Sequence, residues 1–112
     1  MKLQIEGQSL RVRIGEEELA RLLAGQAIEA VTQCAKVFAI RYSLELTVAD
    51  AAELSGSPAS WRIAIPEAQV RTHATLLPTR EGLRFVLPGA RDEDNLQLLF
   101  DVDVRDSVRR RR

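Results

Sequence analysis

Strict alternation of apolar and polar residues recurs along most of this 112-residue chain. The longest run has an apolar or aromatic side chain at every second position from Phe38 to Leu46. A period of two places these side chains on one face of a β-strand and the intervening ones on the other face. The pattern predicts a sheet with one buried and one polar face, because strands buried on both faces are apolar throughout.

Shorter runs of the same kind predict the other strands. Residues 3–5 and 10–14 alternate on either side of a turn that contains Gly7, which predicts a β-hairpin. Residues 47–54 fit no single pattern, and the Ser, Gly and Pro residues of 55–60 are typical of a turn. The remaining predicted strands cover residues 27–32, 61–65, 83–87 and 98–104.

Two short helices are predicted between the strands. Leu19, Leu22 and Leu23 form an apolar stripe after a glutamate-rich first turn, and Gly25 is placed to end that helix. A second helix is expected between Pro66 and Pro78. Its apolar side would consist of Val70, Ala74 and Leu77.

These elements predict an α+β fold with a mainly antiparallel sheet of six or seven strands and two short helices. Because one sheet face carries charge, the sheet is expected to pack on one side only or to curl into a half-barrel. Residues 1–106 are interpreted as a single domain. Residues 107–112 are interpreted as a disordered basic tail, since four arginines end the chain.

Composition and charge argue against several classes of protein. Sixteen basic residues balance sixteen acidic ones, which argues against a whole-protein attraction to nucleic acid or membrane. Cys34 is the only cysteine, so an internal disulfide is excluded. Lys2 interrupts the N-terminus where a signal peptide is apolar, and no apolar run reaches the length of a membrane span. We therefore expect a soluble cytoplasmic protein without a membrane partner.

Three segments resemble a family of small, uncharacterised bacterial proteins whose domain has no known function. Met1 to Ile14 is similar to the family's lysine-led strand, polar turn and arginine-bearing strand, which run into a glutamate-rich helix. Ile40–Glu45 and Arg62–Pro66 resemble two later strands, so the resemblance covers roughly residues 1–74. The family has a histidine and an aromatic residue where this chain has Gln33 and Cys34, and no role of that histidine carries over. The resemblance implies a compact mixed fold and no particular chemistry.

No catalytic, metal-binding or cofactor-binding residue is predicted. Cys34 and His73 are single residues of their kinds, and the pattern places the cysteine in a turn and the histidine on the exposed side of the second helix. One cysteine and one histidine do not make a zinc site, and phosphate-binding or nucleophile-elbow motifs are absent from the sequence.

A row of arginines that face outward is a more specific candidate for a binding site. If one curled sheet held them all, they would line a groove that binds an anionic group through bidentate contacts. Glu45, Asp101 and Asp103 are expected on the same face, which favours the simpler interpretation of a solvated face with paired charges. The possible anion-binding residues are Arg11, Arg13, Arg41, Arg62 and Arg84.

The sequence leaves the function open among three classes, of which an enzyme is the least favoured. We expect a non-enzymatic binding or accessory module that acts through protein–protein contact with a partner or with a second copy of itself. The alternative is an anion or nucleic-acid binder that uses the outward arginines and the basic C-terminal tail.

Overall fold

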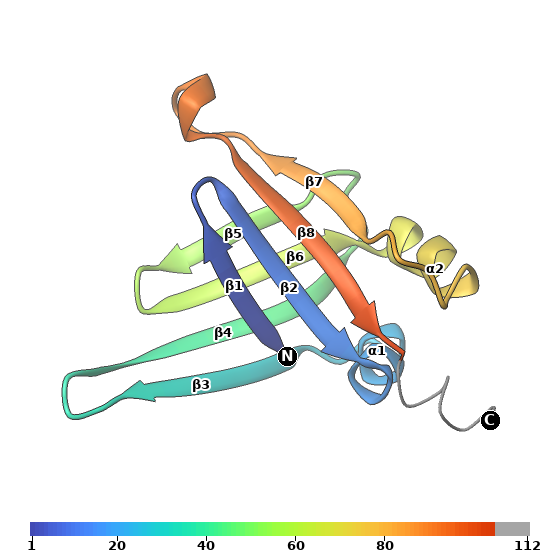
Figure 1. Ribbon diagram of the computed structural model, residues 1–112, viewed down its shortest axis with the longest axis horizontal. Coiled ribbons are helices and arrows are strands. Elements are labelled where there is room, and N and C mark those ends of the chain that lie inside the picture. Colours follow the sequence, from blue (N-terminus) through green and yellow to red (C-terminus); the bar gives the residue numbers. More distant parts are fainter. Residues whose placement is uncertain (105–112) are drawn as a thin grey trace.

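A computed structural model describes residues 1–104, which form eight strands and two α-helices (Figure 1). The tail predicted at 107–112 lies outside the described residues. In chain order the elements are β1 (Lys2–Glu6), β2 (Ser9–Gly15), α1 (Glu16–Leu23), β3 (Ile28–Cys34), β4 (Phe38–Thr47), β5 (Glu53–Ser57), β6 (Ser60–Pro66), α2 (Glu67–Thr75), β7 (Leu83–Leu87), a 3₁₀ turn (Asp92–Asp94) and β8 (Leu96–Asp103).

The strands form two four-stranded mixed sheets. Sheet A has the order β1-β2-β8-β7 and sheet B has the order β3-β4-β6-β5. The two central strands of each sheet are parallel, and the outer strands pair with them antiparallel. The α+β class and the two helices are confirmed, but the prediction of one antiparallel sheet of six or seven strands is wrong. Alternation reveals which face of a strand is buried, and it carries no information about which strand lies beside it.

The inner faces of the two sheets share one hydrophobic core. In Figure 1 sheet A lies in front of sheet B with its strands crossing at an angle, and both helices lie at the same side of the molecule. Fully buried side chains come from both sheets and both helices. The largest are Val12, Ile14, Leu22, Leu44, Ile63, Ile65, Val70, Leu98 and Phe100.

Helix α1 begins where its sequence predicted, and Glu18 fixes that start. The Glu18 carboxylate accepts hydrogen bonds from the Gly15 amide at 3.0 Å and from the Met1 amino group at 2.7 Å. Burial alone would raise the pKa of Glu18, but these hydrogen bonds, together with the positive charges of Met1 and Arg21, hold it below its usual value. The contact joins the first strand to the helix that follows the second.

Strand β5 is the element that sequence patterning missed. Its residues Ser55–Ser57 were expected to form a turn, yet they pair antiparallel with the start of β6. Gly56 has a φ of +107°, and a Cβ at this position would lie 2.0 Å from the carbonyl oxygen of Ser60. Glycine is therefore required by the close approach of two strands, where composition suggested a loop.

Residues 1–104 divide into two halves with the same order of strands and helices, namely strand, strand, helix, strand, strand. Lys2, Ser9 and Glu16 begin β1, β2 and α1, and Glu53, Ser60 and Glu67, each 51 residues later, begin β5, β6 and α2. The pairing registers agree as well, since Glu6 opposite Ser9 corresponds to Ser57 opposite Ser60. Sheet A read from β1 and sheet B read from β5 therefore contain equivalent strands in the same order.

Candidate functional site

Three of the five candidate arginines lie on the outer face of sheet A. Arg11 and Arg13 share one carboxylate, with Asp101 Oδ2 at 3.2 Å from Arg11 Nε and 3.8 Å from Arg13 Nη2. Arg84 lies across β8, where Leu99 pairs with both Arg11 and Arg84. The Arg11 and Arg13 side chains are 44% and 43% exposed, so both guanidinium groups remain partly accessible on this face.

The other two arginines lie on the outer face of sheet B, on the opposite side of the molecule. Arg62 donates a hydrogen bond to Glu45, and this bond and the charge of Glu45 raise the pKa of Arg62. Arg41 borders an open hollow of about 200 Å³, together with Glu29, Ser43 and Ser60. The five arginines therefore line no common groove, because the single sheet that would have gathered them is two sheets facing opposite ways.

The lone cysteine and the lone histidine lie far apart. Cys34 is half-buried at the end of β3, and α2 lies on the other side of the molecule (Figure 1). The expectation that His73 is exposed is wrong, since it is 6% exposed and its ring packs edge-on against Phe100 with centroids 6.5 Å apart. Within residues 1–104 no group of three His, Cys, Asp or Glu side chains is placed to hold a metal ion.

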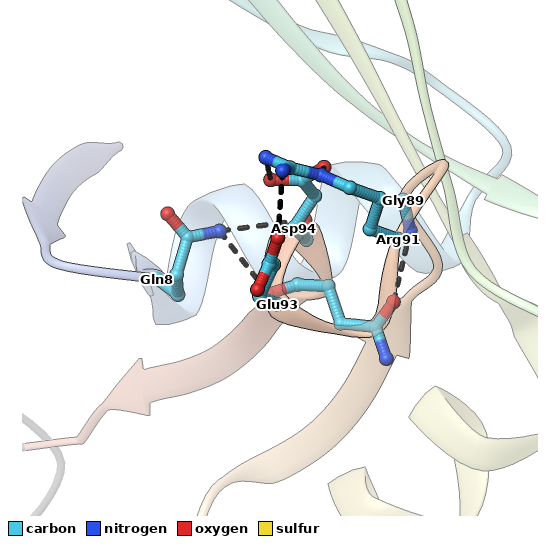
Figure 2. Close-up of polar contacts among 6 residues, drawn as sticks. Gln8, Gly89, Arg91, Glu93 and Asp94 are labelled. Carbon is cyan, nitrogen blue, oxygen red and sulfur yellow. Dashed lines mark hydrogen bonds and ion pairs between the residues drawn. The ribbon is translucent and has the colours of Figure 1, made fainter.

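The loop between β7 and β8 is rich in acidic residues, and contacts among its own residues hold its conformation (Figure 2). Arg91 pairs with Glu93 at 2.7 Å and with Asp94 at 2.9 Å, and the Gly89 amide donates to the Asn95 side chain. Gln8, in the turn between β1 and β2, donates to the backbone carbonyls of Asp94 and Asn95. The Gln8 bonds tie the two connections at one end of sheet A together, while the carboxylates of Glu93 and Asp94 pair with Arg91 within the loop.

The most unusual surface is the far half of the inner face of sheet B. Phe38, Ile40, Tyr42 and Trp61 share this face with the buried Leu44 and Ile63, but they are only half-buried, and Phe38 is 50% exposed. We call these four residues the aromatic platform. The hairpin of β3 and β4 that carries most of it extends past β1 in Figure 1. The alternation thus predicted correctly which side chains face inward, but only some of the inward-facing side chains are buried.

The polar atoms of the platform are satisfied within the chain. Tyr42 shares a hydrogen bond with Thr32 at 3.2 Å, and the Trp61 indole donates to the Pro58 carbonyl at 2.7 Å. Tyr42 and Trp61 are direct neighbours on the parallel strands β4 and β6. Gly56, opposite Trp61 on β5, has no side chain to cover the indole. The Tyr42 and Trp61 rings are therefore held in place, and part of their apolar surface stays accessible to solvent.

The two halves of the chain differ at this surface. Trp61 corresponds to Leu10 in the first half, and Tyr42 corresponds to Leu98 in the second, given the registers of β4 with β6 and of β2 with β8. Leu10 and Leu98 are 2% and 0% exposed. The equivalent positions are thus occupied by buried leucines in sheet A and by half-exposed aromatic side chains in sheet B.

Comparison with known proteins identifies the family. A model of a family of unknown function (DUF7009) matches residues 1–105. The chain belongs to this family. The DUF7009 match covers both halves of the fold, beyond the 74 residues over which the resemblance was noted. The search of curated proteins found no match. Among the described residues neither helix has the length and apolar character needed to cross a bilayer.

Proposed function

We propose that this chain is a non-enzymatic binding module that docks an apolar segment of a partner protein on the aromatic platform. The observation that carries the proposal is the half-exposed state of Phe38, Tyr42 and Trp61 on a face that is core elsewhere. Aromatic residues with fixed rings and an apolar surface dominate the energetics of protein interfaces. Such residues supply contact area with little loss of side-chain entropy.

The charge around the platform favours a protein partner over a polyanion. By strand register, the inner-face neighbours of the platform on β3 and β5 are uncharged, namely Thr32, Cys34, Leu54 and Gly56. Nucleic-acid binding draws most of its affinity from cationic contacts to phosphates. Arg41 and Arg62 lie on the opposite face of the same strands, so they point away from a ligand on the platform.

The test compares the partners captured by three forms of the protein. Phe38→Glu adds a charge to the platform at a half-exposed position, so the fold should tolerate it. Val86→Glu is the matched control, because Val86 is 61% exposed on the outer face of sheet A. Lysate of the source cells, with and without nuclease treatment, is passed over each form, retained proteins are identified by mass spectrometry, and the purified partner is titrated by calorimetry.

We expect Phe38→Glu to weaken the specific partner at least tenfold, which is about 1.4 kcal/mol, while Val86→Glu binds as the unmodified chain does. A partner that binds Phe38→Glu with unchanged affinity would overturn the platform as its site. Self-association that Phe38→Glu abolishes would identify the partner as a second copy. Binding that disappears only after nuclease treatment would instead favour the arginines and the tail.

A further inference from the structure

A second candidate site lies at the other end of the molecule, between α2 and β7. An open hollow of about 310 Å³ is lined there by one stripe of α2 and by Leu83 of β7. Gln69, Thr72, His73 and Leu76 are spaced at i, i+3, i+4 and i+7, so they follow one face of the helix, and Ala68 completes the lining. The volume is at the lower end of the range for small-molecule pockets, about 300–1,000 Å³.

His73 is the polar residue at the inner wall of this hollow. It is 94% buried, as its exposed fraction is 6%, and within residues 1–104 its side chain has no hydrogen-bond or ion-pair partner. Its ring nitrogens are not among the fully buried polar atoms that lack a partner within the described residues, so they reach the hollow that His73 lines. A molecule bound in the hollow can therefore form hydrogen bonds with them.

The equivalent position in the first half shows that packing does not require a histidine. Leu22 occupies it in α1, and Leu22 is 1% exposed. The connections that follow the helices differ too, with residues 24–27 after α1 and the longer 76–82 after α2. The second half thus combines a polar residue in the core with a longer connection beside it, and the hollow lies where the two meet.

We propose that this hollow binds a small, mainly apolar molecule that carries a hydroxyl group, such as a phenol, through a hydrogen bond to His73. An imidazole offers one donor and one acceptor, and a hydroxyl group can complement either. Ala68, Leu76 and Leu83 supply apolar contact for the rest of the molecule. The lining contains no lysine or arginine, so a carboxylate or phosphate would find no permanent positive charge there. This site is separate from the aromatic platform and does not depend on the proposed function.

The test uses three probes of similar size: phenol, toluene (which carries a methyl group in place of the hydroxyl group), and the charged benzoate. Each is titrated into the isotope-labelled full chain while the ring signals of His73, the only histidine, are followed by NMR. We expect phenol to shift these signals and to bind at least tenfold more tightly than toluene, and benzoate to bind most weakly. A site that hydrogen-bonds a hydroxyl group discriminates against the analogue without it.

Two variants separate the hydrogen bond from the cavity. His73→Leu installs the residue of the equivalent position in α1, so the fold should persist, and phenol should lose its advantage over toluene. Ala68→Phe fills the hollow from the exposed side of α2 and should abolish the binding of both probes. Equal binding of phenol and toluene to the unmodified chain, unshifted His73 signals, tighter binding of benzoate, or full binding to Ala68→Phe would each overturn the proposal.

Discussion

Truncation of two residues on the same inner face of sheet B should reveal how far the core extends. Ile63 and Phe38 both face inward, but Ile63 is 0% exposed and Phe38 is 50% exposed. Ile63→Ala removes three carbon groups, worth about 0.8 kcal/mol each in transfer free energy, or about 2.4 kcal/mol together. The cavity that remains adds to this, so a loss of about 3–4 kcal/mol in the free energy of unfolding is expected.

Phe38→Ala should be much milder although it removes a larger side chain. Complete burial of a phenylalanine contributes about 1.5–3 kcal/mol, and about half of that surface is in contact here, so a loss of about 1 kcal/mol is expected. Urea unfolding followed by circular dichroism measures both values, with an unchanged m-value as the sign that the compact states are the same.

Two outcomes would refute this reasoning. A loss below 0.5 kcal/mol for Ile63→Ala, where about 2–5 kcal/mol is usual for a core position, would mean that the faces of β6 are reversed. A loss of about 3 kcal/mol or more for Phe38→Ala would mean that the aromatic platform is covered in solution. Repeating the unfolding at several protein concentrations would then tell whether a second copy covers it.

Three further predictions concern polar contacts and backbone. Glu18→Gln should cost about 1–2 kcal/mol at neutral pH. Because the folded pKa of Glu18 lies below 4.5, that difference should be present above this pH and shrink as the pH falls through the folded value, which chemical denaturation at a series of pH values measures. Gly56→Ala should destabilise the chain by about 1–3 kcal/mol in thermal unfolding, because alanine at a φ of +107° meets the Ser60 carbonyl. Asp101→Asn should cost at most about 1 kcal/mol in urea, and less at high salt, because its arginine pairs are partly exposed; a larger, salt-independent loss would contradict that account.

Local patterns predicted the faces of the strands and the first helix. Leu10, Val12 and Ile14 are buried as their alternation indicated, and α1 ends before Gly25, which has a φ of +92°. The pairing of β2 with β8 could not be predicted in this way, since it joins residues nearly ninety positions apart. Neither strand carries a local signal for its neighbour, because a polar outer face suits parallel and antiparallel pairing equally.

The repeat of the two halves and the inward position of His73 both have a signal in the sequence. The eight residues from Ser9 to Glu16 read SLRVRIGE, and those from Ser60 to Glu67 read SWRIAIPE, so a comparison of the chain with itself indicates the duplication. His73 follows Val70 by three residues, and Ala74 and Leu77 complete the same helical stripe, which places the histidine on the inward face. The extent of the aromatic platform had no such signal, because exposure there depends on where the opposite sheet ends.

The equivalence of the two halves has a consequence for how the molecule is assembled. Each half contributes one hairpin to sheet A and the other to sheet B, so the central seam of each sheet joins two different halves. Neither half can build a complete sheet by itself, and a chain cleaved within residues 48–52 should regain its structure only when both fragments meet. The topology is that of a dimer whose two subunits exchange a hairpin, with both subunits joined in one polypeptide chain. Because both halves lie in one chain, they need not have identical surfaces, and the platform aromatics and the buried His73 are places where they differ.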